Sequence, residues 1–517
     1  MSAPHIGIIG GGIAGATAAL HFAELGLDVS IFERGPSLVD GPPICHLHAG
    51  GNLYREISQQ QCVQLLQESI ETVKLYRHTL NVRPTVIAVP KQDKGQPEDL
   101  LPRLEVIKQA YHQLVASDRS NQVLGDPDHY YQLYSKHDLE RLAKQAVPKP
   151  DDISEASLDE WMIPFAKQVD LNTLKFPVVL VQEYGLSVFR LSATVNISLQ
   201  QLPNCHVYTD TTVTGVNESC YSDGKTNSDI KTDADVKANV DGKGNADNKT
   251  KWNIHFQPSV SPTSGMGDHS RSVEVDYLIN ASGYQTGTVD DWIKAPRSRL
   301  VEFKAAYVSR WLEHDGMWPE VIFHGERGTP QGMAQLTPYP DGYFQLHGMT
   351  EDITLFSDGV AKSTAESSQP KLPAYLINKM IRGWDERQQI ERTNKAIAHM
   401  AQFIPSFASA TVGGKPLFGA QQVPGSDISL RAASVSFVGD NYARLEIVKA
   451  SSAIEAAKQV EAELYNKGYL SASDSIARDP VSARLELRQV LSKAFQLAQQ
   501  RHYPTALADI GGVNRDD

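Results

Sequence analysis

A glycine-rich hexapeptide near the amino terminus has the residue types and the spacing that bind a phosphate group. Residues 10–15 read Gly-Gly-Gly-Ile-Ala-Gly. Gly10 permits a tight turn, Gly12 lets the backbone approach a pyrophosphate, and Gly15 allows a helix to pack closely on a strand. Glu33, about 20 residues further on, offers a carboxylate that accepts hydrogen bonds from a ribose and repels a 2′-phosphate. The chemistry predicted here is the binding of a dinucleotide other than NADP.

Three local elements must hold these residues in place. Residues 5–9 form a short apolar run that predicts a strand, and residues 27–32 predict a second strand. Between them, residues 14–25 carry apolar side chains at helical spacing, and Gly26 supplies a left-handed residue that ends a helix. Such a unit places the phosphate at the positive end of the helix, whereas an ordinary glycine-rich loop does not. The candidate dinucleotide contacts in this unit are Gly10, Gly12, Ile13, Ala14, Gly15, Glu33 and Arg34.

Three later segments extend the pattern. Residues 212–216 predict a strand, residues 276–283 an apolar strand that ends in small residues, and residues 434–440 a strand that reaches a Gly-Asp pair before a helix at about 445–465. Together with the early glycine fingerprint, this order resembles the FAD-binding family that includes D-amino acid oxidase. Malate:quinone oxidoreductase-like proteins and hydroxy-acid dehydrogenases belong to the same broad superfamily.

The resemblance implies that the cofactor is FAD and adds candidate contacts to it. In such proteins a backbone valine lies against adenine, small residues cover the dinucleotide, and the late Asp binds the ribityl chain while the next helix points at the pyrimidine end of the flavin. The matching positions here are Val213, Ala281, Gly283, Gly439 and Asp440. No second Gly-x-Gly-x-x-Gly follows a strand, so we expect no nicotinamide domain, and oxygen or a quinone as electron acceptor.

A glycine-rich segment at 41–55 resembles the loop that lies beside the isoalloxazine ring in relatives such as glycerol-3-phosphate and 2-hydroxyglutarate dehydrogenases. In that loop a histidine is followed by small residues, as in His48, Ala49, Gly50 and Gly51. Because a histidine holds or releases a proton near neutral pH, His48 is our first candidate for a catalytic base or a flavin contact. A structural histidine bonded to a loop carbonyl and a covalent histidine–flavin link are the alternatives.

Oxidation of a C–H bond by a flavin also needs a group that orients the substrate's carboxylate. His347 and His324 each end a predicted strand before a glycine, where a base could face the flavin or simply lie at a sheet edge. Arginines that could form a bidentate carboxylate clamp are Arg327, Arg444, Arg310 and Arg55. We favour Arg327, between predicted strands, and Arg444, just after the Gly-Asp pair. The predicted catalytic residues are His48, His347, Arg327 and Arg444.

These residues lead to one main prediction of function and two alternatives. The main prediction is an FAD-dependent dehydrogenase or oxidase that transfers a hydride from a small amino or hydroxy acid to flavin N5. A flavin monooxygenase or halogenase is the first alternative, although residues 316–319 (Gly-Met-Trp-Pro) resemble the halogenase tryptophan motif only faintly. The second alternative is a protein in which a flavin has a structural role only.

Composition limits the class of protein. The chain has 517 residues, of which 41% are hydrophobic and 21% charged, as in globular proteins with packed cores. Its formal net charge of −12 offers no basic surface for nucleic acid. Four cysteines (Cys45, Cys62, Cys205 and Cys220) lie far apart, so we expect reduced thiols and no metal site. No signal peptide and no apolar run of membrane-spanning length are evident, which predicts a cytoplasmic protein and leaves peripheral membrane contact open.

The expected fold class is α/β: a Rossmann-like FAD-binding domain with a substrate domain of antiparallel β-sheet plus helices. We assign residues 1–90, 178–290 and 430–470 to a discontinuous FAD-binding domain, and residues 91–177 and 291–429 to a substrate or cap domain. Residues 217–250 are almost wholly polar and predict a disordered insertion between strands of a three-stranded arm. Residues 471–517 predict a helical tail whose apolar side docks on the protein, with a membrane-surface or partner helix as the alternative.

Overall fold

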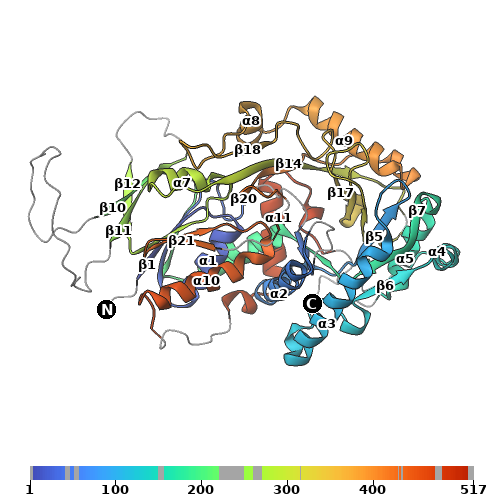
Figure 1. The fold of residues 1–517 in the computed structure, drawn as a ribbon, viewed down its shortest axis with the longest axis horizontal. Coiled ribbons are helices and arrows are strands. Elements are labelled where there is room, and N and C mark those ends of the chain that lie inside the picture. The colour runs from blue at the N-terminus through green and yellow to red at the C-terminus, as the bar shows by residue number, and fades with distance from the viewer. Residues whose placement is uncertain are drawn as a thin grey trace, which may run out of the picture.

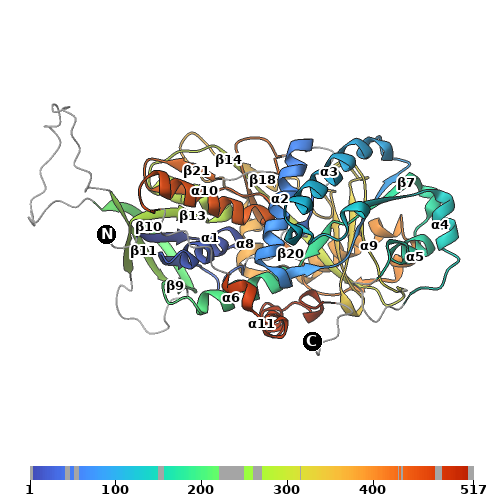
Figure 2. The same ribbon diagram turned by 90° about the horizontal axis from the view of Figure 1, so that it is seen from below.

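The computed structural model describes residues 4–40, 47–51, 57–148, 156–219, 250–259, 270–314, 316–428, 430–431, 435–471 and 480–510. The molecule is elongated, and its two main sheets lie toward opposite ends of the long axis (Figures 1 and 2). Sequence reasoning predicted an α/β fold with a Rossmann-like unit and a separate sheet with helices, and this prediction is confirmed.

A six-stranded sheet with the order β21-β22-β13-β1-β2-β9 contains the glycine fingerprint. Its strands are β1 (His5–Ile9), β2 (Asp28–Phe32), β9 (Cys205–Tyr208), β13 (Tyr277–Asn280), β21 (Val435–Val438) and β22 (Tyr442–Leu445). All pairs are parallel except β21 with β22. The helices α1 (Ile13–Glu24), α6 (Val188–Gln200) and α10 (Ala453–Asn466) cover one face and form an apolar core with it. Parallel strands buried on both faces explain the nearly continuous apolar runs in this part of the sequence.

A three-stranded antiparallel sheet packs on the other face of the six-stranded sheet. It consists of β10 (Thr211–Ser219), β11 (Lys251–Pro258) and β12 (Arg271–Val275), in that order. Phe32 at the end of β2 stacks on Tyr208, with ring centroids 4.9 Å apart. Because β10 continues to Ser219 in register with Lys251, the predicted insertion begins later than residue 217. Residues 220–249 lie outside the described residues.

A ten-stranded sheet forms the other half of the molecule, with the order β18-β14-β17-β16-β15-β5-β7-β6 and with β19 and β20 both paired to β14. Its strands are β5 (Thr85–Pro90), β6 (Tyr131–Tyr134), β7 (Leu174–Val181), β14 (Arg299–Arg310), β15 (Glu320–Phe323), β16 (Ala334–Pro338), β17 (Tyr343–Gly348), β18 (Val360–Lys362), β19 (Thr411–Val412) and β20 (Leu417–Pro424). The strands that the sequence predicted to end at His324 and His347 are present, as β15 and β17. β5, which we had assigned to the FAD-binding domain, pairs with β15 and β7 and belongs to this sheet.

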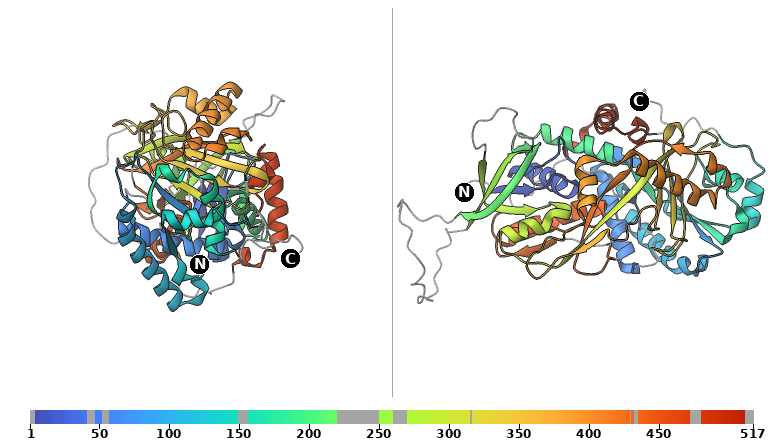
Figure 3. Two further views of the ribbon diagram at one scale, coloured as in Figure 1. Left: turned by 90° about the vertical axis from the view of Figure 1, so that its right-hand side faces the viewer. Right: turned by 90° about the horizontal axis from the view of Figure 1, so that it is seen from above.

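Helices cover the outer, apolar face of this large sheet. They are α4 (Lys136–Leu142), α5 (Leu158–Gln168), α8 (Ala374–Arg382) and α9 (Glu386–Ala401). Figures 1 and 3 show α8 and α9, in orange, lying across the sheet. On the inner side, α2 (Gln59–Leu75) and α3 (Leu101–Ser117) pack against β5 and β7. On the inner side of β14 to β17, Ala306 and Val308 pack against α6 and α11, and the candidate site lies beside them, where the described residues of these strands are mostly polar.

The remaining elements join the two halves. A small sheet of β3 (Leu47–Ala49), β8 (Tyr184–Leu186) and β4 (Leu80–Asn81) lies between them. The tail helix α11 (Leu487–Gln500) packs against α6, as its apolar side predicted (Figure 2). The other helical turns are α7 (Thr286–Trp292), η1 (Arg77–Thr79), η2 (Pro97–Leu100), η3 (Arg119–Asn121), η4 (Pro127–His129), η6 (Leu171–Thr173), η7 (Gly283–Gln285), η8 (Pro340–Gly342), η9 (Pro405–Ser409), η10 (Ala450–Ser452), η11 (Val481–Arg484) and η12 (Thr505–Leu507).

Candidate functional site

The glycine turn after β1 has the geometry of an anion site. Gly10 adopts a φ of +102°, and a Cβ atom placed on it would lie 2.4 Å from the carbonyl oxygen of Ala281. A Cβ on Gly15 would lie only 1.9 Å from the carbonyl oxygen of Gly10, so the first turn of α1 packs directly on the turn. Gly12, the N-cap of α1, has open space around its Cα, and no side chain caps the helix. The amino end of α1 is therefore accessible to a bound anion.

Glu33 is fixed beside this turn. Its two carboxylate oxygens accept hydrogen bonds from the backbone N–H groups of Gly11, at 2.8 Å, and Gly35, at 2.7 Å. Burial raises the pKa of Glu33, while these two hydrogen bonds act in the opposite direction. These two hydrogen bonds hold the carboxylate next to Gly11, with lone pairs left for a ligand hydroxyl. The neighbouring Arg34 is exposed, and its Nη2 lies 3.4 Å from the hydroxyl of Tyr284.

Three other predicted contacts lie near the same edge of the six-stranded sheet. The N–H of Ala281 donates to the carbonyl oxygen of Ile9 at 2.8 Å, so the chain after β13 runs beside the glycine turn. Gly283 has a φ of +58° and open space around it. Val213 lies on β10, next to a bulge, and packs in the cluster that contains Phe32. The structure therefore brings these positions to the edge where β1, β2 and β13 end.

The assignment of Gly439 and Asp440 to the flavin site is wrong. These residues form the turn between β21 and β22, and β22 runs parallel to β13, so the turn lies at the opposite edge of the sheet from Gly10. The carboxylate of Asp440 is exposed and accepts a hydrogen bond from Lys467 Nζ at 2.7 Å. The expected helix does begin at the correct edge, because β22 leads through residues 446–452 into α10. Two apolar runs joined by a short glycine turn are the signature of a hairpin, and this signal was overlooked.

His48 lies on β3 against the inner face of the large sheet. It is buried, and its Nε2 lies 3.4 Å from both Glu320 Oε1 on β15 and Gln335 Nε2 on β16. Ala49 is fully buried, and Gly50 has a φ of +142° at a point where a Cβ would collide with Glu183. The segment that the sequence placed beside the isoalloxazine therefore supplies a strand of the small sheet and contacts the large sheet through His48. Residues 41–46 and 52–56, with Arg55, lie outside the described part of the chain.

The inner face of β14 to β17 is polar and buried. Side chains alternate along these strands, and one set joins the apolar core under α9. The opposite side carries a group of polar residues, all buried, of which Glu320 and Gln335 contact His48: Glu302, Lys304, Glu320, Gln335, Thr337, Gln345 and His347. The strand register pairs Gln335 with His347, and Thr337 with Gln345. A buried surface of this kind requires polar partners, which a bound ligand can supply.

Arg327 lies in the loop after β15 and is part of this surface. Its Nη2 donates to Glu302 Oε1, and Lys304 Nζ lies 2.9 Å from Glu302 Oε2. Burial on its own would raise the pKa of Glu302, but the charges of Lys304 and Arg327 bring that pKa below its usual value. Two cations thus share one carboxylate. Arg327 Nη1 is buried and has no hydrogen-bond partner in the part of the chain that the structure describes, so the group has capacity for another anion.

Arg444 is not a carboxylate clamp, contrary to the sequence prediction. Its Nε donates to Asp290 at 2.6 Å and its Nη2 to the carbonyl oxygen of Ala295 at 2.8 Å, while Nη1 lies 3.4 Å from Ser436 Oγ. Arg299 of β14 donates to the other carboxylate oxygen of Asp290, and all three charged side chains are buried. Arg444 therefore ties the two sheets together through a buried ion network.

Of the other sequence candidates, Arg310 is exposed and stacks on Tyr343 at the far end of the large sheet. His324 is half-buried just after β15. Sequence reasoning missed Glu320, Gln335 and the Glu302–Lys304 pair. The alternation Val-Glu-Phe-Lys-Ala at 301–305 could have indicated a strand with one polar side, because apolar and charged residues alternate there.

Among the described residues, no group of three or more His, Cys, Asp or Glu side chains could hold a metal ion. No described helix has the length and apolar composition that crossing a bilayer requires.

Comparisons with known proteins agree with this geometry. The model of an NAD(P)-binding Rossmann-like domain matches residues 8–39. No curated protein sequence matches the chain.

Among solved structures, L-amino acid deaminase from Proteus vulgaris is similar with a TM-score of 0.52 and 12% identity, covering 94% of this chain and 98% of that one. FAD-bound L-α-glycerophosphate oxidase from Mycoplasma pneumoniae has a TM-score of 0.52 and 13% sequence identity, and the match covers 90% of this chain and 95% of that one. Glycine oxidase from Geobacillus kaustophilus has a TM-score of 0.51 and 11% sequence identity, and the match covers 92% of this chain and 99% of that one. Over nearly its whole length, the chain therefore has the fold of these oxidases and deaminases.

Proposed function

We propose that this protein is an FAD-dependent oxidoreductase that oxidises a small amino or hydroxy acid. The observation that carries the proposal is the buried polar face of the large sheet, which lies against the loop that bears His48. A dinucleotide-type turn at one end and a water-excluded polar surface at the other are what a flavin oxidase needs to hold its cofactor and its substrate. The shared fold with amino acid and glycerophosphate oxidases supports the same conclusion.

The residues present fit the cofactor. The open amino end of α1 at Gly12 can receive the pyrophosphate, and Glu33 is fixed where a ribose hydroxyl can bind it. Ala281 and Gly283 leave the neighbouring edge free of large side chains, so the dinucleotide can lie across it. FAD, when bound, supplies the hydride acceptor, and this chain's residues position the donor and move its proton.

The substrate's carboxylate is assigned to Arg327. Its buried, unpartnered Nη1 and the excess of cations around Glu302 favour an anion at this place. His347 is two residues from Met349, whose carbonyl oxygen accepts the N–H of Gly328, and so it lies near the Arg327 loop. We therefore propose that His347 or His48 is the base that accepts the proton of the substrate's amino or hydroxyl group. The acceptor of the electrons is oxygen or a quinone, because no second glycine fingerprint for a nicotinamide occurs in the sequence.

The test begins with the purified full-length chain. We expect a flavin absorbance spectrum, either as isolated or after FAD is added, and anaerobic bleaching of that spectrum by at least one member of a panel of amino and hydroxy acids without NAD(P)H. A requirement for NAD(P)H would instead indicate a monooxygenase or halogenase, and a flavin that no donor bleaches would indicate a structural role. A colourless protein whose melting temperature does not change with FAD would refute the proposal entirely.

A pair of variants then tests the carboxylate site. Arg327→Gln is expected to raise the KM for the identified acid by about 10–1000-fold, the range for loss of a charge-assisted hydrogen bond of about 1.5–4 kcal/mol. The matched control is Arg310→Gln, the same substitution at an exposed position at the other end of the sheet, and its KM should stay at the wild-type value. Equal KM values in both variants would move the carboxylate site away from Arg327.

A further inference from the structure

A separate cavity of about 340 Å³ lies at the end of the large sheet where β16 and β17 are joined. Its walls are mainly aromatic and apolar, and they include Trp161, Met317, Trp318, Tyr339, Pro340 and Phe344. Cavities that bind small molecules typically have volumes of about 300–1,000 Å³ and are lined in this manner, with few polar groups. The volume suits a molecule of one or two rings.

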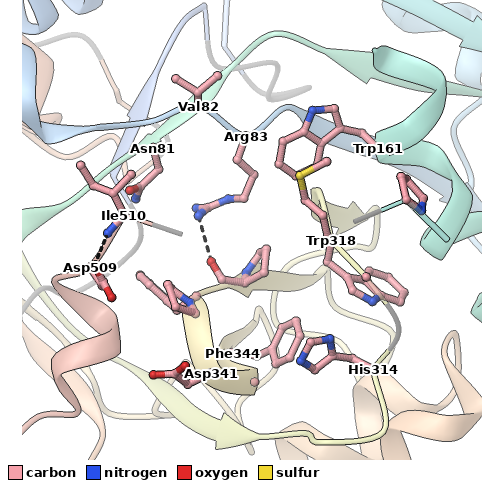
Figure 4. A pocket seen from close by; sticks show the side chains of 17 residues that line it. Asn81, Val82, Arg83, Trp161, His314, Trp318, Asp341, Phe344, Asp509 and Ile510 are labelled. Atoms are coloured by element: carbon pink, nitrogen blue, oxygen red, sulfur yellow. Dashed lines mark hydrogen bonds between the residues drawn. The ribbon is translucent and has the colours of Figure 1, made fainter. Parts of the chain in front are cut away.

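Arg83 supplies the main polar group of this cavity. Figure 4 shows its side chain reaching in between Asn81 on one side and Trp161 on the other. The side chain is 9% exposed. Its Nη1 donates to the carbonyl oxygen of Pro338 at 2.9 Å, and its Nη2 lies 3.3 Å from Glu320 Oε2. Its Nε is buried and has no acceptor among the residues that the structure describes. A buried N–H without an acceptor is costly, and a ligand oxygen in the cavity would remove that cost.

The charges around the cavity favour a neutral ligand. Arg83 is paired with Glu320, and the buried Arg190 interacts electrostatically with Asp509, which also lines the cavity. These four groups therefore balance, with two positive and two negative charges. Asp341 also lines the cavity but is exposed, so water solvates it, and the other titratable side chains among the described lining residues are His314 and Tyr339. An ionised ligand would leave one charge unbalanced in a largely apolar space, which is unfavourable.

We propose that this cavity binds a neutral, flat, mostly apolar molecule that presents a carbonyl oxygen to Arg83. The rings of such a molecule would pack between Trp161, Trp318 and Phe344, where aromatic contacts favour flat ligands. Aromatic ketones and quinones share this chemistry. The site is distinct from the carboxylate site at Arg327, and it does not depend on the proposed oxidation.

The cavity is also connected to His48. Arg83 holds Glu320, whose Oε1 accepts a hydrogen bond from Gln335 Nε2 at 2.5 Å and lies 3.4 Å from His48 Nε2. A ligand in contact with Arg83 is thus separated from His48 by one ion pair. If the natural ligand is redox-active, it would lie on the side of the protein where the proposed reaction takes place.

The experiment uses full-length protein and four small probes. 1-Tetralone and duroquinone carry a carbonyl group, naphthalene has none, and benzoate is charged. Binding is measured by calorimetry and by quenching of tryptophan fluorescence, because Trp161 and Trp318 line the cavity. We expect the two carbonyl probes to bind with one site per chain and at least tenfold more tightly than naphthalene or benzoate, as one hydrogen bond to a charged donor predicts. Tighter binding of benzoate, or equal binding of naphthalene, would overturn the proposal.

Two variants locate the site. Val82→Trp fills the mouth of the cavity from an exposed position and should abolish binding, whereas Val360→Trp is the matched control on β18. The two valines are 39% and 41% exposed, and Val360 does not line the cavity. Arg83→Met should weaken 1-tetralone at least tenfold and leave naphthalene unchanged. Because Arg83→Met also removes the partner of Glu320, Val82→Trp is the decisive variant. If Val82→Trp bound the carbonyl probes with wild-type affinity, the proposed site would be refuted.

A last measurement distinguishes a quinone from an inert carbonyl compound as the natural ligand of the cavity. Holoprotein reduced with dithionite is mixed anaerobically with duroquinone, which takes up two electrons and two protons to give the quinol as the flavin is reoxidised. Rapid reoxidation that is lost in Val82→Trp would support a quinone as the natural occupant. Binding of both carbonyl probes without such reoxidation would support an inert carbonyl compound at the same site.

Discussion

Replacement of Gly12 by aspartate should separate the stability of the fold from cofactor binding. Gly12 is the N-cap of α1, has an extended backbone with a φ of −65°, and has no atom within 4 Å of where a Cβ would lie. Aspartate is among the best N-cap residues and also interacts favourably with the helix dipole. The free energy of unfolding of the FAD-free protein should therefore stay the same or rise by about 0.5–1 kcal/mol.

The same substitution should prevent FAD from binding. The new carboxylate would occupy the space that the proposal gives to the pyrophosphate. At a separation of about 5 Å and an effective dielectric constant of about 20, one pair of like charges repels by about 3 kcal/mol. That free energy corresponds to a loss of affinity of more than about 100-fold. The neutral Gly12→Asn has nearly the same volume, so the difference between Asp and Asn isolates the electrostatic part.

The assays are urea unfolding of FAD-free protein and a fluorescence titration with FAD. A contrasting variant is Gly15→Ala, whose Cβ would lie 1.9 Å from the carbonyl oxygen of Gly10 and force α1 to move. Overpacking of this kind costs about 1–3 kcal/mol, against a helix-propensity gain of about 1 kcal/mol. Gly15→Ala should thus be less stable than Gly12→Asp. If Gly12→Asp folded normally and bound FAD within threefold of wild type, the anion site at α1 would be disproved.

Three further predictions concern residues whose roles the structure redefines. Arg444→Ala should destabilise the protein by about 3 kcal/mol, measured by chemical unfolding, because Asp290 stays buried and loses one of the two arginines that it pairs with among the described residues. A change in the KM for substrate at normal stability would contradict this structural role. Asp440→Ala should alter stability by less than about 0.5 kcal/mol and leave the flavin spectrum unchanged, since its ion pair with Lys467 is exposed. The pKa of Glu302 is lowered in the folded state, so the stability it contributes is present above the ordinary glutamate pKa of about 4.3 and is lost as the pH falls through the lower, folded pKa. The stability advantage of wild type over Glu302→Gln should consequently shrink from pH 6 toward about pH 3, and an advantage that grows on acidification would reverse the assigned sign.

Local patterns were sufficient to predict much of this fold. The apolar run, the glycines and the acid at residue 33 define β1, α1 and β2 because each depends only on its neighbours in sequence. The β-forming runs of β14 to β17 and the apolar side of α11 are local signals as well. These local signals predicted the strands and the helix correctly, although they hold no information on which other elements the strands and the helix contact.

Pairing and partner choice could not be predicted in the same way. The β5 segment was assigned to the FAD-binding domain because its partners in the large sheet, β7 and β15, lie about 85–235 residues further along the chain. Arg444 was taken for a clamp because nothing in the sequence near it indicates the buried Asp290. Glu320 and Gln335 reach His48 only through the register of three different strands. Each of these errors concerns a contact between residues distant in sequence.

The route of the chain between the two main sheets has a consequence for how the protein can be divided. The chain leaves the six-stranded sheet after β2, supplies β5, β6 and β7 to the large sheet, returns for β9 and β13, leaves again for β14 to β20, and comes back for β21 and β22. Any continuous fragment that contains all strands of one sheet also contains strands of the other. Neither half can therefore be produced alone by truncation, and a ligand that stabilises one end must also oppose the unfolding of the other.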